Sequence, residues 1–310
     1  MSRVAFIGLG NMGSPMSQRL IDAGHDVIGS DPAAPARERL AAAGGTPVGS
    51  APEAAAAADA VILMLPNSDV VEAVAGELLA SGALRDGALV IDMSSSEPLR
   101  TRALHASLAE AGVRFADAPV SGGVGGAERG ALTIMLGADD GDRAEAHELL
   151  APLGTVRDCG QVGSGHAVKA LNNFMSATHL WATSEAMVVG ERFGLDPEVM
   201  LEVINGSSGR SGSTQNKWPN FILPGTYDSG FGLRLMLKDM RIAAALAGEL
   251  GRALPLGDRA IALWTEAAGD LPADADHTRV AEWILEHAHA HAHAPAPEHP
   301  TTNATEGTTP

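Results

Sequence analysis

A lysine and an asparagine lie one helical turn apart in a segment where most other residues are apolar. The stretch QVGSGHAVKALNNFMSATHL (161–180) is typical of a turn that opens a long helix, with Lys169 and Asn173 at positions i and i+4, so the two share one face. A lysine that faces a partly desolvated crevice has a lowered pKa and can exchange a proton with a substrate oxygen. Lys169 is therefore a candidate catalytic acid/base and Asn173 a candidate for holding the substrate oxygen. A polar stripe that faces solvent is the alternative interpretation.

A glycine-rich turn near the start of the chain indicates a dinucleotide site. GLGNMG matches the pattern GxGxxG and lies between an apolar, β-rich run and a helical pattern, which is the context that this motif requires. Gly8 permits a tight turn, Gly10 lets a pyrophosphate approach the backbone, and Gly13 lets the helix pack close to the strand. The free N–H groups at the start of the helix favour phosphate. A βα turn without a ligand is the alternative. The candidate residues are Gly8, Leu9, Gly10, Asn11, Met12 and Gly13.

An aspartate at the end of the second expected strand bears on the choice of cofactor. Asp31 follows the glycine motif by about twenty residues, the position from which a carboxylate binds the adenosine ribose hydroxyls. Its charge repels a 2′-phosphate, and Pro32 follows it rather than an arginine. The sequence therefore predicts NAD as the preferred cofactor without excluding NADP. A plain turn residue in SDP is the alternative for Asp31.

Three later segments follow expected strands and supply further candidate ligands. Ligands of open α/β sheets lie beyond the carboxyl ends of the strands, where LMLPNSD (63–69) and DMSSSEP (92–98) are expected. DAPVSGGVGGA (117–127) places a hydroxyl beside glycine backbone, which is typical of a loop that binds a carboxylate. Helix caps, ordinary loops or a flexible glycine linker are the alternatives. The candidates are Leu65, Pro66 and Asn67 for the nucleotide, Ser95 for the nicotinamide end, and Ser121, Gly122 and Gly123 for the substrate.

Composition and charge exclude several classes of partner. The chain has 310 residues and a net charge of −17, which disfavours binding to a nucleic acid backbone. The single cysteine, Cys159, rules out an internal disulfide and fits a reducing compartment. No stretch reaches the ~20 apolar residues of a membrane span, and MSRVAFIGLG has neither the charged leader nor the apolar run of a signal peptide. We therefore expect a soluble cytoplasmic protein that binds neither nucleic acid, membrane nor metal.

The order of the expected elements predicts an α/β fold followed by helices. Apolar strand patterns alternate with helical patterns as far as Gly160, which favours a doubly wound parallel sheet with helices on both faces. Helical patterns alone follow, at 168–191, 197–204, 234–250, 256–268 and 276–287. The predicted domains are a dinucleotide-binding domain (1–161), an all-α substrate and dimerisation domain (162–287) and a disordered tail (288–310). The alternating histidines of the tail are expected to be solvated rather than to form a metal site.

Taken in order, these motifs resemble those of the β-hydroxyacid dehydrogenases, especially the 3-hydroxyisobutyrate dehydrogenases. FIGLGNMG, MLPN, DMSSSEP, DAPVSGG, GSGHAVKALNN and LMLKDM occur in sequence between Val4 and about Leu285. The resemblance implies a Rossmann domain that binds NAD(P) and a helical domain that supplies the substrate pocket and a dimer interface. It also implies that Lys169 is the acid/base, that Asn173 orients the substrate and that Ser121 to Gly123 bind its carboxylate.

The same resemblance adds candidates outside the long helix. It implies that Lys238, in LMLKDM, approaches the cofactor and the substrate, with Asp239 beside it. Ser95 stands where relatives usually have threonine, so the hydroxyl is retained. Arg210, in SSGR, is a candidate second anion-binding group, and an exposed loop arginine is the alternative. The following SGSTQNKWPN does not match those dehydrogenases closely, which leaves the exact hydroxy acid open.

The predicted function is an NAD(P)-dependent transfer of hydride between a small 3-hydroxy acid and the nicotinamide, with Lys169 as acid/base. Three alternatives differ in their sequence requirements. Imine reductases share the architecture but usually lack the lysine, and 6-phosphogluconate dehydrogenases have a longer helical domain and a histidine before the asparagine. A non-catalytic dinucleotide-binding protein would not need Lys169 and Asn173. Because the long apolar helix requires burial, we expect a homodimer or homotetramer.

Overall fold

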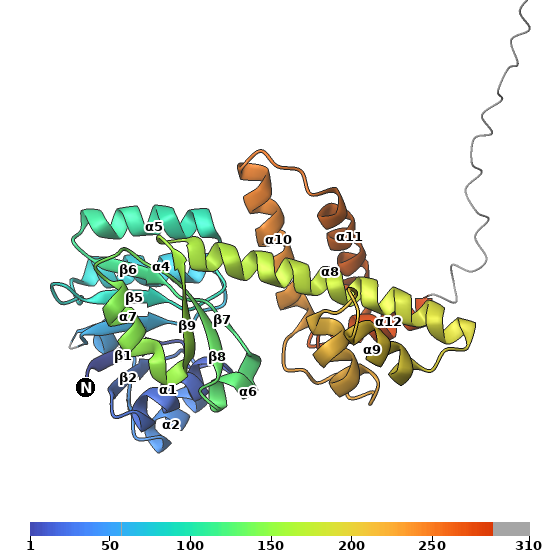
Figure 1. Cartoon of the computed structure of the whole chain (residues 1–310). Helices are drawn as coiled ribbons and strands as arrows, with labels where there is room; N and C mark the ends of the chain where they lie inside the picture. Colours follow the sequence, from blue (N-terminus) through green and yellow to red (C-terminus); the bar gives the residue numbers. More distant parts are fainter. Residues whose placement is uncertain (57, 288–310) are drawn as a thin grey trace, which may run out of the picture.

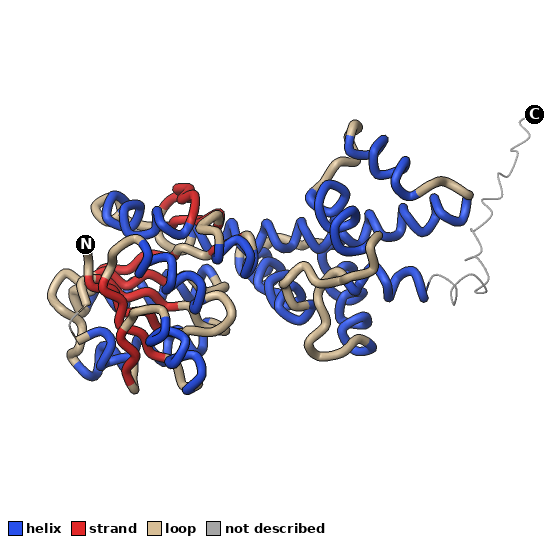
Figure 2. The backbone as a smooth tube through the Cα atoms, turned by 90° about the horizontal axis from the view of Figure 1, so that it is seen from below, coloured by secondary structure: helices blue, strands red, loops and turns tan. Residues whose placement is uncertain are grey.

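One long helix, α8 (Ser164–Phe193), joins an α/β part of the chain to an all-helical part (Figure 1). The computed structural model describes residues 1–56 and 58–287. Figure 2 shows that the strands are confined to the α/β part, so the predicted combination of an α/β sheet with an all-helical region is confirmed. The predicted disordered tail, 288–310, with its alternating histidines, lies outside the described residues.

The α/β part contains one sheet whose chain starts in the middle and winds to both sides. The strand order is β3-β2-β1-β4-β5-β6-β8-β7, with β9 beside β8. Pairing from β3 to β6 is parallel throughout, so the loops that follow these strands meet at one edge of the sheet. The strands are β1 (Arg3–Ile7), β2 (Asp26–Ser30), β3 (Thr46–Val48), β4 (Ala60–Leu63), β5 (Leu89–Asp92), β6 (Arg114–Asp117), β7 (Val120–Ser121), β8 (Leu132–Gly137) and β9 (Gly154–Gly160).

One end of the sheet differs from the all-parallel arrangement that the sequence predicts. β8 pairs antiparallel with β6 and β7, because the chain reverses through the six-residue helix α6 (Gly123–Glu128) and lacks the long crossover that parallel neighbours need. Three strands, β3, β7 and β9, are not predicted from the sequence. β3 and β7 are very short, and β9 is a largely polar, exposed strand with the sequence GTVRDCG.

Helices cover both faces of the sheet, as the continuous apolar runs of its strands predict. Along β1, Val4 and Phe6 pack beneath α1, α2 and α7, whereas Ala5 and Ile7 pack against α3, α4 and α5. The helices of this part are α1 (Gly13–Asp22), α2 (Ala34–Ala42), α3 (Ala51–Ala55), α4 (Ser68–Ser81), α5 (Pro98–Glu110), α6, α7 (Arg143–Leu150) and the 3₁₀ turn η1 (Ala151–Leu153).

The helical part packs around the second half of α8. Its core includes Trp181 of α8, whose ring centroid lies 6.3 Å from that of Trp264 and 5.9 Å from that of Trp283. The remaining elements are α9 (Pro197–Asn205), the π-helical segment η2 (Ser213–Ile222), α10 (Leu233–Glu249), α11 (Pro255–Asp270) and α12 (Arg279–His287). Among the described residues, none of the helices combines the length and the apolar character that a membrane span requires.

Two helical elements differ from the sequence prediction. η2 has no counterpart among the predicted helices. It contains Pro219, and because proline disfavours the interior of a helix, the sequence pattern does not predict one here. α12 begins at Arg279 rather than at Asp276, because the Asp276 carboxylate accepts hydrogen bonds from the backbone N–H groups of Gly230, Phe231 and Thr278. Asp276 therefore fixes the loop before α10 instead of taking part in a helix.

The first turn of α8 is packed tightly against the sheet. A Cβ atom at Gly165 would lie 2.1 Å from the carbonyl oxygen of Met135 in β8 and 2.8 Å from a carboxylate oxygen of Asp117. No side-chain rotation can relieve a contact with backbone, so any larger residue at position 165 must displace the helix from the sheet. The close approach therefore determines where α8 leaves the sheet.

We predict that Gly165→Ala destabilises the protein by about 1–3 kcal/mol, the usual cost of overpacking a core. The free energy of unfolding, measured in denaturant, checks this. The control is Gly76→Ala, at an exposed position in α4 where an added Cβ meets nothing within 4 Å. That change should stabilise the protein by roughly 0.5–1 kcal/mol because it favours helix. A Gly165→Ala variant as stable as the wild type would show that α8 is not held by this contact.

Candidate active site

The glycine turn has the geometry that a pyrophosphate site requires. Gly8 has φ 97° and donates its N–H to the Ser30 carbonyl, and a Cβ at Gly13 would lie 1.9 Å from the Gly8 carbonyl oxygen. A Cβ at Gly10, by contrast, would meet nothing within 4 Å. The two outer glycines are therefore required by the fold, while the middle one leaves open space beside the backbone just before α1 begins. This arrangement fits a bound dinucleotide phosphate.

Asp31 is attached to this turn through its own carboxylate. One carboxylate oxygen accepts the Leu9 N–H at 2.8 Å and the other accepts the Ala33 N–H at 2.8 Å. The guanidinium of Arg37, on α2, donates to the carbonyls of Asp31 and Pro32. Sequence reasoning looked for an arginine only at position 32 and missed Arg37, which reaches the same place from the following helix. Both an acid and a cation therefore lie at the end of β2.

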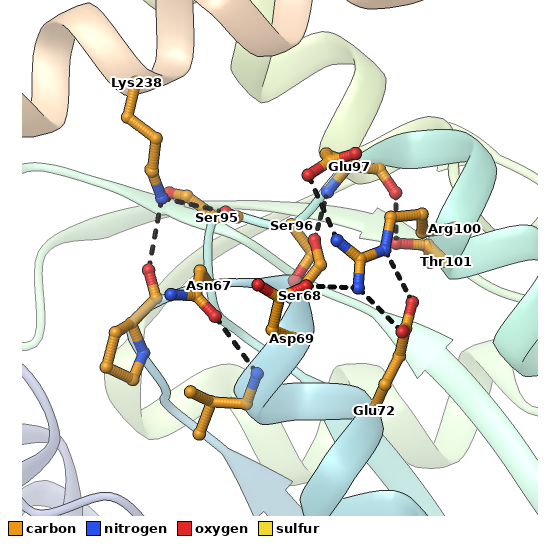
Figure 3. A network of polar contacts seen from close by, with 12 residues as sticks. Asn67, Ser68, Asp69, Glu72, Ser95, Ser96, Glu97, Arg100, Thr101 and Lys238 are labelled. Atoms are coloured by element: carbon orange, nitrogen blue, oxygen red, sulfur yellow. Dashed lines mark hydrogen bonds and ion pairs between the residues drawn. The ribbon is translucent and has the colours of Figure 1, made fainter.

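Lys238 connects the helical part to two strand-end loops of the sheet (Figure 3). Its ammonium donates to the Ser95 carbonyl at 3.0 Å, after β5, and to the Pro66 carbonyl at 3.3 Å, after β4. The backbone N–H of Leu65 donates to the Ser94 hydroxyl. Lys238 thus lies among the residues predicted to contact the nucleotide, although it comes from α10.

Asn67 has a structural role in the same loop. Its side-chain oxygen accepts the Val70 N–H at 3.0 Å and thereby caps the start of α4. Nearby, the Arg100 guanidinium binds Asp69 and Glu72, which fastens α5 to α4 (Figure 3). The side chain of Asn67 therefore acts as a helix cap, which was the alternative interpretation of this loop. Contact between Asn67 and the nucleotide remains a prediction.

Lys169 and Asn173 lie on the buried face of α8, with exposed fractions of 7% and 5%. The side-chain amide of Asn173 donates to the Asp239 carboxylate at 2.6 Å, and the Lys169 ammonium lies 5.8 Å from the centroid of the Phe231 ring. The interpretation of this helix face as a stripe directed at solvent is therefore wrong. Asp239 lies next in the chain to Lys238, and its second oxygen is 3.5 Å from the Lys238 ammonium.

Burial favours the neutral form of Lys169. Burial lowers the pKa of Lys169 below the ordinary lysine value of 10.5, the Asp239 carboxylate opposes this shift, and the positive charge of Lys238 adds to it. A lysine with a lowered pKa is more readily present as the neutral amine, which can accept a proton and return it. The group Lys169, Asn173, Lys238 and Asp239 can therefore support proton transfer at a substrate oxygen.

The loop that contains Ser121, Gly122 and Gly123 approaches this group from the sheet. Gly122 has φ 132° and Gly123 has φ 63°, conformations that favour glycine. A Cβ at Gly123 would lie 4.0 Å from the Ser229 carbonyl oxygen, in the loop that also carries Phe231. The α/β and helical parts thus meet at this loop, and its glycine backbone has no side chains to block an anion.

Arg210 is not brought into this group. It is exposed in the loop after α9, where its backbone N–H donates to the Ser207 carbonyl. This position agrees with the alternative, an exposed loop arginine. Its proposed role in binding substrate rests on the motif resemblance alone.

Sequence reasoning missed a buried group of polar side chains at the start of α8. The His166 ring lies 2.9 Å from the Thr101 hydroxyl and 3.1 Å from the Ser94 carbonyl, and the Asp117 carboxylate accepts the N–H groups of Gly163 and His166. Burial raises the pKa of Asp117, and the charge of His166 opposes that shift. GSGHAVK contains this histidine, but its partners lie far away in the chain, so the motif alone does not reveal the contact.

Comparison with known proteins shows similarity to dehydrogenases over most of the chain. A family profile described as the NAD binding domain of 6-phosphogluconate dehydrogenase matches residues 3–163, and one described as NAD-binding of NADP-dependent 3-hydroxyisobutyrate dehydrogenase matches residues 163–284. A probable 3-hydroxyisobutyrate dehydrogenase of Mycobacterium tuberculosis is 38% identical over 298 residues, which cover 93% of this chain and 99% of that protein.

Two solved structures share the fold of this chain to different degrees. The 3-hydroxyisobutyrate dehydrogenase of Mycobacterium tuberculosis with L-serine has a TM-score of 0.86 at 37% identity and covers 92% of this chain and 99% of its own. The imine reductase of Bacillus cereus has a TM-score of 0.60 at 20% identity and covers 91% of this chain and 98% of its own. The second likeness concerns the fold alone.

Proposed function

The chain belongs to the β-hydroxyacid dehydrogenase family, and from this premise we propose that it transfers a hydride between a small 3-hydroxy acid and the nicotinamide of NAD(P). The observation that carries the proposal is the buried Lys169, whose lowered pKa suits proton exchange with a hydroxyl group. Relatives named 3-hydroxyisobutyrate dehydrogenase cover nearly the whole chain, so 3-hydroxyisobutyrate and similar acids are the proposed substrates.

Each part of the group has a proposed task in this reaction. The substrate carboxylate binds the loop from Ser121 to Gly123, and its hydroxyl group binds Lys169 and Asn173. Lys169 in its neutral form accepts the hydroxyl proton during oxidation, and Asn173, held by Asp239 at 2.6 Å, orients the oxygen. The bound nicotinamide supplies the hydride acceptor, and the chain supplies position and proton transfer. Lys238, on the carbonyls after β4 and β5, keeps α10 close to the cofactor loops.

We predict that Lys169→Ala lowers turnover by ~10²-fold or more while cofactor binding is retained. Because the neutral amine is the base, kcat for alcohol oxidation should rise with pH through the pKa of Lys169, which burial places below 10.5. The reverse reduction needs the protonated amine and should fall over the same range. Steady-state rates in both directions, with nicotinamide binding followed by fluorescence, measure this. Near-wild-type turnover in Lys169→Ala would remove the lysine from the mechanism.

We propose NAD as the preferred cofactor, on the basis of the Asp31 carboxylate at the end of β2. The expected result is a higher kcat/KM with NAD than with NADP. Asp31→Asn keeps the shape of the side chain but removes its charge, so it should reduce the NAD to NADP ratio by about tenfold or more. Arg37→Ala is the matched control, since Arg37 lies beside Asp31. A wild-type preference for NADP that Arg37→Ala abolishes would reverse the assignment.

We propose that α8 also forms a contact between copies of the chain, giving a homodimer or a tetramer of dimers. Its apolar residues Met175, Val189 and Phe193 are 54%, 68% and 82% exposed, and helical geometry places them on the side opposite Lys169. Val189→Glu should therefore weaken association, which sedimentation velocity over a range of concentrations would detect. A wild-type protein that sediments as a monomer at every concentration would contradict this interface.

A further inference from the structure

A second, partly buried lysine lies beside the same face of α8 and has no task in the reaction described above. Lys217 extends from η2, and its ammonium donates to the Ser176 hydroxyl at 2.9 Å. Ser176 follows Asn173 by three residues and Lys169 by seven, which at helical period places all three on one face. The ammonium of Lys217 therefore lies about one helical turn beyond Asn173, in the direction that leads along α8 away from the sheet.

Lys217 has no carboxylate in contact. Within residues 1–56 and 58–287, its ammonium has the Ser176 hydroxyl as its one hydrogen-bond partner and forms no ion pair. Burial lowers the pKa of Lys217 to about 8, and Asp276 opposes this shift from a distance. The ammonium of this partly buried side chain has a single neutral partner, so two of its N–H groups are available to an anion from outside the chain.

The nearest acid, Asp276, is already occupied. Its carboxylate accepts hydrogen bonds from the Ser229 hydroxyl and from the backbone N–H groups of Gly230, Phe231 and Thr278. Although burial opposes it, hydrogen bonds from His277 and Thr278 hold the pKa of Asp276 below its ordinary value. Asp276 is thus committed to the loop before α10 and does not neutralise Lys217 by direct contact.

Phe231 connects the surroundings of Lys169 and Lys217. Its ring centroid lies 5.8 Å from the Lys169 ammonium and 5.8 Å from the centroid of the His277 ring. Burial lowers the pKa of His277, a hydrogen bond with Asp276 opposes this shift, and the charge of Lys217 adds to it, so Lys217 lies close enough to affect His277. The Nε2 atom of His277 is buried without a hydrogen-bond partner among the described residues, which adds a second polar atom that the fold leaves unpaired.

We propose that Lys217 and Ser176 form a second anion subsite, which binds a carboxylate at the end of the substrate opposite the one that meets Ser121 to Gly123. The inference rests on the proposed function, because it places the reacting hydroxyl at Lys169. A substrate aligned along α8 would then present one carboxylate to the sheet, its hydroxyl to Lys169 and its far end to Lys217. The preferred substrates are accordingly dicarboxylic 3-hydroxy acids. A substrate whose far end is a methyl group would leave Lys217 without an anion.

The spacing along α8 also predicts a preference for chain length. Seven residues separate Lys169 from Ser176, which corresponds to about 10 Å along the helix axis. The long side chains of Lys169 and Lys217 make the distance between their ammonium groups shorter than this, yet a very short acid still cannot reach from one to the other. Affinity should therefore increase with the number of methylene groups before the second carboxylate and then decline once the chain is too long.

The test compares matched pairs of substrates in the wild type and in Lys217→Met. 2-(Hydroxymethyl)succinate and 2-(hydroxymethyl)butanoate share a skeleton and differ in whether the chain ends in a carboxylate or a methyl group, and longer homologues extend both series. In the wild type, kcat/KM should favour the best diacid over its matched monoacid by tenfold or more. Lys217→Met should lower kcat/KM for the diacid by about ten- to a hundredfold, as expected for loss of one charge-assisted hydrogen bond, and leave the monoacid within a few-fold.

The controls separate a substrate-binding role from a structural one. Ser176→Ala, which retains the positive charge, should cause a smaller loss for the diacid than Lys217→Met does. An equal loss for diacid and monoacid in Lys217→Met, or no diacid preference in the wild type, would overturn the subsite. If the wild type turned over neither class, the proposed function would fail. The affinities of the two acids, measured by calorimetry, would then test the subsite. The subsite requires that the diacid binds more tightly than the monoacid and that Lys217→Met abolishes this difference. Equal affinities in the wild type would refute it.

Discussion

The attachment of the first turn of α8 to the sheet is the constraint on which the site depends. Asp117, at the end of β6, accepts two N–H groups from this turn, those of Gly163 and His166, at 2.6 and 2.7 Å. A carboxylate at this position satisfies otherwise unpaired backbone donors and complements the helix dipole. The His166 ring is bound between Thr101 and Ser94, and Gly165 leaves no gap to β8. Because Lys169 follows His166 by less than one turn, these contacts determine where its ammonium lies relative to the sheet.

A second connection holds the helical part against the loops that follow β4 and β5. Lys238 donates to carbonyls after β4 and β5, while the neighbouring Asp239 binds Asn173. α10 therefore contacts the sheet through one residue and α8 through the next. The Asp239 carboxylate contacts the Lys238 ammonium and lies close enough to Lys169 to affect its pKa. Burial lowers the pKa of Lys169, and these two residues of the helical part modify that shift, whereas the position of Lys169 is set by the sheet.

The sequence predicted the features that depend on local patterns. A glycine turn, the end of a strand and the polar face of a helix each depend on residues that are close together in the sequence. GLGNMG, Asp31 and the pair Lys169 and Asn173 could therefore be named as candidates from the sequence alone. Features that depend on contacts between distant residues were not. The antiparallel β8, the polar strand β9 and the π-helical η2 are determined by packing rather than by periodicity. Arg37, Phe231 and Lys217 were missed for the same reason, since each comes near the site from an element whose own sequence carries no functional signal.

We propose that a hydride passes from the hydroxyl-bearing carbon of a 3-hydroxy acid to the nicotinamide at this site. The most direct measurement uses 3-hydroxyisobutyrate, or whichever 3-hydroxy acid is turned over fastest, with deuterium on that carbon, followed by mass spectrometry of the reduced cofactor. We expect one deuterium on the nicotinamide ring and a slower rate than with the unlabelled acid when the chemical step limits turnover. Reduced cofactor without deuterium, or no cofactor reduction with any 3-hydroxy acid, would contradict it.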